Sequence, residues 1–189
     1  IVYSQEQLID YIARSADVTR GHPILIDQFL EDAFEFDVDA LCDGEEVYIG
    51  AIMQHIEEAG IHSGDSACVL PPYKIKSKTI AEIERITSLL AIEINVIGLI
   101  NIQFAYKDNE LFVLEVNPRA SRTTPFVSKT TNVPLAKIAA QLSTGSKLKE
   151  YNLPKWNDIK HVAIKEAVLP FNKFPSESIF LSPEMKSTG

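Results

Sequence analysis

The chain has 189 residues, 46% of them hydrophobic and 23% charged, which is enough for one soluble globular domain with a substantial core. Its 26 acidic and 18 basic residues give a formal charge of −8, and no basic stripe occurs, which argues against a nucleic-acid partner. No apolar run reaches membrane-spanning length and no signal peptide opens the chain, so no membrane partner is expected.

The first predicted elements are short. Residues 1–3 are apolar enough for a strand, and because the chain starts inside it, we expect a piece of something longer. Ser4 and Gln7 have the spacing of a capping box, which predicts a helix to about Arg14. The apolar run at 23–26 predicts another strand.

Two longer strands follow, over residues 34–41 and 47–56, joined by a turn at Asp43-Gly44. In the first of them, polar and apolar residues alternate, so the carboxylates share one face. That face holds Glu35, Asp37 and Asp39, and the opposite face holds Phe34, Phe36, Val38 and Ala40. From the pattern alone, Glu35 is interpreted as a solvated outward residue of this strand.

The rest of the chain alternates loops and helices. Residues 57–72 are rich in Gly, Ser and Asp and are expected to form a loop, and apolar spacing predicts a helix over 77–94. Residues 120–133 are polar and irregular, and a helix over 134–142 has proline in its first turn. From residue 147 onward the composition changes to that of an arm, with one β-like run over 162–169.

The two cysteines, Cys42 and Cys68, are too few and too far apart for a disulfide framework or a zinc site. Both lie among apolar residues, so we expect buried thiols in a reducing compartment, consistent with a cytoplasmic location. The predicted elements are dominated by hairpins rather than crossovers, and no internal repeat is evident. This order indicates an α+β fold with a mainly antiparallel sheet.

The strongest hairpin pattern is GLINIQFAYKDNELFVLEVNPR, residues 98–119. A two-residue turn at Asp108-Asn109 would place Gln103 opposite Leu114 and mix apolar with polar faces. A three-residue loop places Gln103 opposite Glu115 and Asn101 opposite Asn117. The pattern therefore predicts the three-residue loop, with Arg119 just past the strand end.

Such a face, bearing amide and carboxylate oxygens, suits a hard cation. Mg²⁺ takes oxygen ligands and often shares them with substrate phosphates, and an arginine beside it would suit phosphoryl charge. The alternative is an ordinary solvated face of an antiparallel sheet, where polar residues alternate with core residues. The hairpin alone leaves both interpretations open.

Several motifs resemble one family. Gln103 followed by Glu115-x-Asn117-Pro-Arg119 is similar to the metal-binding motif of the ATP-grasp enzymes. The longer strings IHSGDSA (61–67), LEVNPRASRTTPFVSKTT (114–131) and VLPFNKFP (168–175) resemble the large subunit of carbamoyl phosphate synthetase, in its second, C-terminal synthetase half. The resemblance covers essentially the whole chain and implies the C-terminal subdomain of an ATP-grasp fold.

The resemblance implies roles for particular residues. Gln103, Glu115 and Asn117 would be ligands of a pair of Mg²⁺ or Mn²⁺ ions that bridge the ATP phosphates. Arg119 would stabilise charge on the transferred phosphoryl group, and Arg122 would assist with an anionic substrate.

The same resemblance implies a nucleotide site built from earlier segments. Adenine and ribose would be held by Gln28, Phe29, Leu30 and Glu35, and the nucleotide would also meet the loop of Gly60, Ile61, His62 and Ser63. A carboxylate such as Glu35 can accept hydrogen bonds from two vicinal hydroxyls. The family also uses K⁺, which would lie near Glu35, His55 and Ser66. His62 alone would be interpreted as a surface loop histidine.

The implied reaction is ATP- and Mg-dependent phosphorylation of carbamate to carbamoyl phosphate, for pyrimidine and arginine biosynthesis, with no covalent protein nucleophile. The implied partners are a glutamine amidotransferase small subunit and the other domains of the large subunit. Residues 1–146 would be the end of the first ATP-grasp subdomain plus the metal- and nucleotide-binding subdomain, and 147–189 an arm leading to the next domain.

Two alternatives remain. Another ATP-grasp ligase, such as a biotin-dependent carboxylase or a purine-pathway enzyme, would share Glu-x-Asn-Pro-Arg but not HSGDSA or PFNKFP. A non-catalytic folding unit would bind only nucleotide or partner subunits. No glycine-rich flap of the first ATP-grasp subdomain occurs in the sequence, so we expect the isolated chain to bind ATP weakly and turn over little or nothing.

Overall fold

A computed structural model describes residues 2–19, 22–176 and 178–188. It divides into two compact units, Ile1–Leu30 and Glu31–Gly189. The first unit contains the helix α1 (Gln5–Thr19), which is longer than predicted. Half of the predicted capping box is confirmed, because Ser4 Oγ accepts a hydrogen bond from the Gln7 amide at 3.2 Å. Gln7 Oε1 accepts its hydrogen bond from the Tyr3 amide, at 2.8 Å, rather than from the Ser4 amide.

The two strands predicted in this unit are wrong. Residues 2–3 and 23–26 are irregular, and residue 1 lies outside the described part of the chain. A strand needs a hydrogen-bonded partner, and within the described residues neither segment pairs with a strand. A short apolar run therefore predicted local extension without the pairing that would stabilise it.

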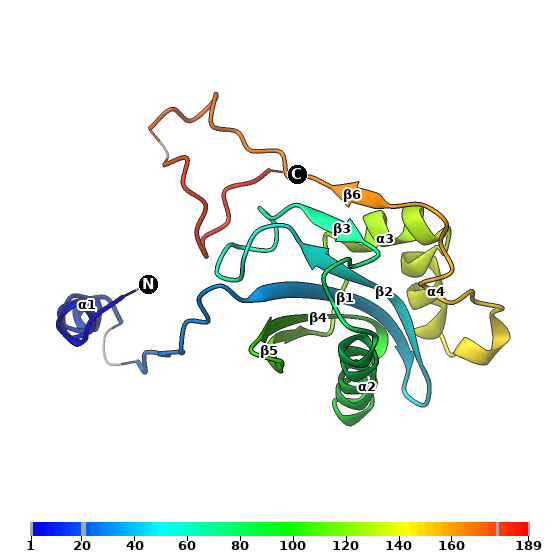
Figure 1. Cartoon of the computed structure of the whole chain (residues 1–189). Coiled ribbons are helices and arrows are strands. Elements are labelled where there is room, and N and C mark those ends of the chain that lie inside the picture. The colour runs from blue at the N-terminus through cyan, green and yellow to red at the C-terminus, as the bar shows by residue number, and fades with distance from the viewer. Residues whose placement is uncertain (1, 20–21, 177, 189) are drawn as a thin grey trace. The chain divides into compact units, whose positions relative to one another are not determined.

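The second unit is organised around one six-stranded sheet with helices on its faces (Figure 1). The strand order is β5-β4-β1-β2-β3-β6 and every neighbouring pair is antiparallel, which confirms the predicted α+β class. The elements are β1 (Phe34–Asp43), β2 (Val47–His55), β3 (Cys68–Leu70), α2 (Ser77–Glu93), β4 (Ile97–Lys107), β5 (Glu110–Asn117), α3 (Thr124–Thr131), α4 (Leu135–Leu142), the 3₁₀ helix η1 (Leu148–Glu150) and β6 (Ala163–Lys165).

The β4–β5 hairpin has the predicted register of its polar residues, but its turn differs from the predicted one. Its turn has two residues, Asp108 and Asn109, with φ of 52° and 65°, as a tight hairpin turn of mirror-image type requires. A bulge at Leu114 then shifts the pairing by one residue, so that Gln103 lies opposite Glu115. The predicted three-residue loop is wrong, but the predicted pairing of the polar residues is confirmed.

Strand β1 lies at the centre of the sheet, between β2 and β4. Its carboxylates are not solvated, as the pattern alone would suggest: Glu35 is 3% exposed, Asp37 2% and Asp39 1%. The alternation was predicted correctly, but both faces of this strand are covered. A central strand that is buried on both faces cannot be recognised from the alternation of its own residues.

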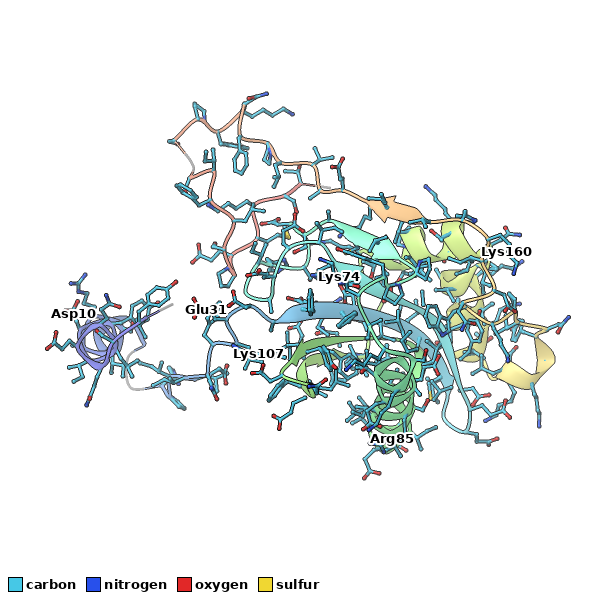
Figure 2. The ribbon with its side chains drawn as sticks, in the orientation of Figure 1. Asp10, Glu31, Lys74, Arg85, Lys107 and Lys160 are labelled. Carbon is cyan, nitrogen blue, oxygen red and sulfur yellow. The ribbon has the colours of Figure 1, made fainter. Side chains whose placement is uncertain are left out.

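Helix α2 packs against one face of the sheet, and α3 and α4 pack against the other (Figure 1). The approach of α4 depends on Gly50 of β2, because an added Cβ there would lie 2.9 Å from the Asp39 carbonyl oxygen and 3.0 Å from Leu135 Cδ1. On its outward side α2 carries Arg85, which pairs with Glu82 at 2.7 Å in solvent (Figure 2). None of the described helices combines the length and apolar character that a bilayer crossing requires.

Three elements depart from the predictions. Strand β3 and helix α3 lie in segments predicted to be irregular, and β6 covers only residues 163–165 of the predicted β-like run. The segment after residue 147 packs back on the core, where Trp156 is 5% exposed and its Nε1 donates to Glu84 Oε1 at 2.7 Å. Cys42 and Cys68 are buried free thiols, as predicted.

Candidate functional site

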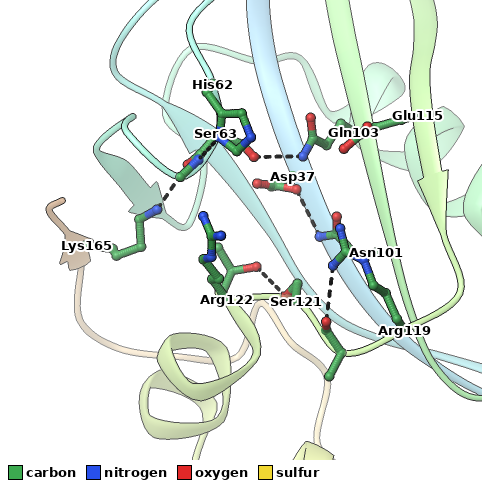
Figure 3. A pocket seen from close by; sticks show the side chains of 13 residues that line it. Asp37, His62, Ser63, Asn101, Gln103, Glu115, Arg119, Ser121, Arg122 and Lys165 are labelled. Carbon is green, nitrogen blue, oxygen red and sulfur yellow. Dashed lines mark hydrogen bonds between the residues drawn. The ribbon is translucent and has the colours of Figure 1, made fainter. Parts of the chain in front are cut away.

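A polar cleft of ≈ 380 Å³ lies on the face of the sheet that carries α3 (Figure 3). Gln103 and Glu115 border it from the hairpin, while Arg122 and Lys165 reach it from the opposite side. The lining residues are Asp37, His62, Ser63, Gly64, Asn101, Gln103, Glu115, Arg119, Ala120, Ser121, Arg122, Thr123 and Lys165. The cleft thus brings together segments from five parts of the sequence.

The amide and carboxylate groups of the hairpin are arranged with oxygens available. Gln103 Nε2 donates to Ser63 Oγ at 2.9 Å, which leaves Gln103 Oε1 as a free acceptor. Asn117 Nδ2 donates to Glu115 Oε1 at 3.0 Å, which leaves the Asn117 oxygen and the second Glu115 oxygen. These oxygens fit a hard cation that completes its shell with phosphate and water. In the described part of the chain, no cluster of three or more His, Cys, Asp or Glu has metal-binding geometry.

The cleft also holds cationic side chains suited to phosphate and carboxylate groups. Arg119 and Arg122, the two residues predicted to be catalytic, both line it. Lys165 of β6 joins them, with its Nζ donating to the Ser63 carbonyl at 3.3 Å. The close approach of Arg122 needs Gly64, because an added Cβ there would lie 2.6 Å from Arg122 Nη1. Arg122 also contacts the Met185 thioether.

A smaller hollow of ≈ 230 Å³ adjoins the hairpin. It gathers seven of the residues predicted to bind nucleotide, together with Leu114 and Pro183. These seven are Glu35, Gly60, Ile61, His62, Ser63, Gln103 and Glu115. The remaining predicted nucleotide residues, Gln28, Phe29 and Leu30, lie in irregular chain at the end of the first unit.

The loop around His62 is held by its own contacts and by the C-terminal segment. His62 Nδ1 accepts a hydrogen bond from the Gly64 amide at 3.0 Å, and the His62 amide donates to the Ser182 carbonyl at 2.9 Å. Asp65, 3% exposed, accepts from the amides of Lys186 and Ser187 at 2.8 and 2.7 Å. Although burial raises the pKa of Asp65, these hydrogen bonds dominate and lower it. Asp65 stays ionised and ties the C-terminal segment to this loop.

Beneath the cleft, the β1 carboxylates belong to a buried network. His55 Nε2 lies 3.2 Å from Asp37 Oδ2, and Asn101 Nδ2 donates to Asp37 Oδ1 at 2.9 Å and to Asp39 Oδ1 at 3.0 Å. Burial raises the pKa of Glu35 to about 7 and that of Asp39 to about 6. Burial lowers the pKa of His55, but its hydrogen bonds to Asp37 and Cys68, together with the charges of these two groups, outweigh burial and raise the pKa well above normal.

Two atoms of this region are buried without a hydrogen-bond partner among the described residues: His55 Nδ1, which lies 3.5 Å from Glu35 Oε1, and Ser66 Oγ. Buried polar atoms are normally satisfied, so orphaned ones indicate a missing neighbour. A Ser66 oxygen and a Glu35 carboxylate fit a monovalent cation, whereas the imidazolium form of His55, which its raised pKa favours, would repel one. The three residues predicted to surround K⁺ are thus only partly suited to bind it.

The raised pKa of Asp39 gives a stability prediction. Because its pKa is about 6 in the folded state against 3.8 ordinarily, the folded chain keeps a proton that the unfolded chain loses. The stability that protonated Asp39 contributes to the free energy of unfolding is therefore fully present below pH 4 and is lost as the pH rises through 6. The loss amounts to up to about 3 kcal/mol. The free energy of unfolding, measured by urea denaturation, should fall more steeply between pH 4 and 7 for the wild type than for Asp39→Asn. The exposed control Asp158→Asn should follow the wild type, and parallel curves for wild type and Asp39→Asn would contradict the assignment.

Several residues of the site were not singled out by the sequence. Asp37, Asp39 and Asn101 were assigned to polar strand faces without a role, and Lys165 lies in a segment interpreted as an arm. The three carboxylates alternating along one strand were the available signal. Their burial, however, depends on the segment after Arg119, which lies some 80 positions further along the chain (the Ser121–Asp39 hydrogen bond spans 82 residues).

The antiparallel sheet with helices on both faces is the fold of the C-terminal subdomain of an ATP-grasp protein. A solved structure, the biotin carboxylase domain of a single-chain bacterial carboxylase, superimposes with a TM-score of 0.67 over 90% of this chain and 45% of that chain. Its sequence identity is 13%, so it shows the shared fold alone.

The sequence comparisons give the family. The family described as "Carbamoyl-phosphate synthase L chain, ATP binding domain" matches residues 1–151. The carbamoyl phosphate synthase large chain of Archaeoglobus fulgidus is 61% identical over 189 residues, all of this chain and 18% of that protein. The "Carbamoyl phosphate synthase large chain, C-terminal section" of Methanocaldococcus jannaschii is 52% identical over 199 residues, covering all of this chain and 32% of that protein. The chain belongs to the carbamoyl phosphate synthase large-chain family, and spans less than a third of either relative.

Proposed function

We propose that this chain is the nucleotide- and metal-binding part of the C-terminal half of a carbamoyl phosphate synthase large chain, an ATP-dependent ligase. The observation that carries the proposal is the pairing of Gln103 with Glu115 at the floor of a cleft that Arg119 and Arg122 also line. The similarity to a relative named as a C-terminal section supports the choice of this half.

The proposed reaction transfers the γ-phosphoryl group of ATP to carbamate. A carbamate oxygen forms a bond to the γ-phosphorus, the bond from that phosphorus to the β–γ bridging oxygen breaks, and ADP leaves with the electron pair. Such a transfer needs alignment and neutralised charge rather than a covalent protein nucleophile. Arg119 and Arg122, which line the cleft, would neutralise charge on the transferred group, and Lys165 would supply a further cation.

The residues that would hold a pair of Mg²⁺ or Mn²⁺ ions are Gln103, Glu115 and Asn117. The bound ions would neutralise phosphate charge. Ser63 orients the Gln103 amide so that its oxygen faces outward, and Asn117 orients one oxygen of Glu115. A K⁺ ion beside Glu35, His55 and Ser66 is proposed as a further cofactor, supported by the unpartnered Ser66 hydroxyl in the described network.

The nucleotide would extend from this platform into the smaller hollow. Gly60, Ile61, His62 and Ser63 border that hollow, and Glu35 lies within it as the proposed acceptor for the ribose hydroxyls. Gln28, Phe29 and Leu30 are proposed to read the adenine. Residues 1–146 would supply the end of the first ATP-grasp subdomain and the platform, and 147–189 the connection to the next domain.

Replacing Glu35 with Gln should weaken the preference for ATP over 2′-deoxy-ATP. Above the Glu35 pKa of about 7 the carboxylate is ionised, and its charge-assisted hydrogen bond to a ribose hydroxyl exceeds a neutral one by about 1.4 kcal/mol, so the preference measured there should fall about tenfold. The ratio of kcat/KM for the two nucleotides, measured in the intact large chain, gives this preference. Glu46→Gln, an exposed glutamate of the β1–β2 turn, should keep it. An unchanged ratio in Glu35→Gln would remove Glu35 from the ribose site.

The 189-residue chain alone should release little or no ADP from ATP in the presence of carbamate or bicarbonate and Mg²⁺. The reason is that the sequence has no glycine-rich flap to close over the phosphates. ADP release, compared at equal concentration with that of the intact large chain, measures this. Turnover near that of the intact chain would contradict the proposed division of labour between subdomains.

In the cell, the product would serve pyrimidine and arginine biosynthesis in the cytoplasm. A glutamine amidotransferase small subunit would supply ammonia, and the other domains of the large chain would deliver the carbamate. Membership of the family supports this proposal. Copurification of a small subunit with the large chain that carries this sequence would test the association.

A further inference from the structure

Asp39 occupies an unusual position at the centre of the sheet. Its side chain is 1% exposed and lies beneath the cleft, where it contacts no predicted metal ligand through a hydrogen bond. Asn101 Nδ2 donates to its Oδ1 at 3.0 Å, Ser121 Oγ to the same oxygen at 2.7 Å and Thr123 Oγ1 to its Oδ2 at 2.6 Å. Two of these three donors come from the loop that connects β5 with α3.

That loop carries both arginines of the cleft. Arg122 lies between Ser121 and Thr123, so the residues on each side of it are bound to the same carboxylate. Ser121 also makes reciprocal hydrogen bonds with Thr124, in which the Thr124 amide donates to Ser121 Oγ at 3.0 Å and the Ser121 amide donates to Thr124 Oγ1 at 3.1 Å. The backbone at Arg122 is therefore fixed to the middle of β1 and to the start of α3.

The side chain of Arg122, by contrast, is exposed and makes no ion pair within the described residues. Beyond its contacts with Gly64 and the Met185 thioether, the position of its backbone limits the volume that this exposed side chain can reach. Catalytic groups must be held within a fraction of an ångström of their working positions, and buried contacts behind them supply this precision. Burial of a carboxylate is costly unless its acceptors are satisfied, and here two of the three satisfying donors are the loop's own hydroxyls.

We propose that Asp39 is a positioning residue for phosphoryl transfer: through Ser121 and Thr123 it fixes the loop that presents Arg119 and Arg122 to the transferred group. This role rests on the proposed function. It predicts that the loop hydroxyls matter for the rate of transfer rather than for nucleotide binding. Asp39 itself touches neither substrate nor metal.

The test uses the intact large chain and replaces the loop hydroxyl rather than the buried carboxylate. Thr123→Val removes one donor to Asp39 at nearly constant shape, and Thr123→Ser retains it. Thr87→Val is the matched control, because Thr87 is equally buried on α2 and its hydroxyl has no hydrogen-bond partner in the described part of the chain. Steady-state kinetics of carbamate phosphorylation and amide hydrogen exchange of residues 118–124 are measured on all three variants and the wild type.

Thr123→Val should lower kcat about tenfold, which is the effect expected from the loss of one hydrogen bond to a charged group. The KM for ATP should stay within about threefold of the wild-type value. Exchange across 118–124 should accelerate, and Thr123→Ser should restore both quantities. Unchanged kcat and exchange in Thr123→Val, or an equal loss in Thr87→Val, would overturn the proposal. If the wild type itself phosphorylated no carbamate, the proposed function would fail, whereas the exchange data would still decide whether Asp39 fixes the loop.

Discussion

Replacing Arg119 with Ala should lower kcat for carbamate phosphorylation by about a thousandfold in the intact large chain. Arg119 lies two residues past the end of β5 and lines the same cleft as Glu115, where the phosphoryl charge would develop. The loss should fall mainly on kcat, because the interaction strengthens as charge moves onto the transferred group. Arg119→Lys should recover only part of it, since a lysine cannot offer the planar, two-pronged contact of a guanidinium.

The matched control for this change is Arg85→Ala. Arg85 is an exposed arginine on the outward side of α2, where it pairs with Glu82 away from the cleft. Its removal should leave kcat and KM unchanged. The measurement is ADP formation dependent on carbamate, together with thermal unfolding to verify that both variants fold. A kcat for Arg119→Ala within about threefold of the wild type would contradict the assigned role.

Replacing Glu115 with Gln should lower kcat by about 10²- to 10³-fold and raise the Mg²⁺ concentration needed for half-maximal activity. The substitution keeps the size of the side chain and the hydrogen bond from Asn117, but removes the only carboxylate among the three proposed metal ligands. Activity titrated with Mg²⁺ at fixed ATP measures both effects. Glu110→Gln, an exposed glutamate at the start of the same strand, should behave as the wild type. Unchanged synthesis of carbamoyl phosphate in Glu115→Gln would remove it from the metal site.

The β4–β5 hairpin shows which structural features could be predicted from the sequence and which could not. Alternation of polar and apolar residues predicted that Gln103 lies opposite Glu115, and the structure has this pair. The combination of a two-residue turn with a β-bulge was not predictable. The turn at Asp108-Asn109 is compatible with that pair only if one residue bulges out of the strand. Leu114 is the bulged residue, and it is 46% exposed. Local patterns thus identified the functional pair, while the irregularity that creates it depends on the whole sheet.

Helix α3 shows the opposite case. Its sequence TPFVSKTT is dominated by β-branched and polar residues with weak helix propensity, so a loop was predicted. Buried contacts of Val127, together with the proline in its first turn, stabilise the helix in the folded chain. The burial of Asp39 follows from the same packing, because Thr123 at the start of α3 covers it. Neither could be predicted from local sequence, because both depend on contacts between distant segments.

The most direct test of the account is nucleotide-dependent binding of Mn²⁺, followed by electron paramagnetic resonance in the intact large chain with a non-hydrolysable ATP analogue. We propose that Gln103, Glu115 and Asn117 form a platform for the cation that accompanies ATP. Glu115→Gln should then bind fewer Mn²⁺ ions than the wild type at the same free concentration, while Glu110→Gln should bind as many. Equal Mn²⁺ binding in Glu115→Gln and the wild type would contradict the claim.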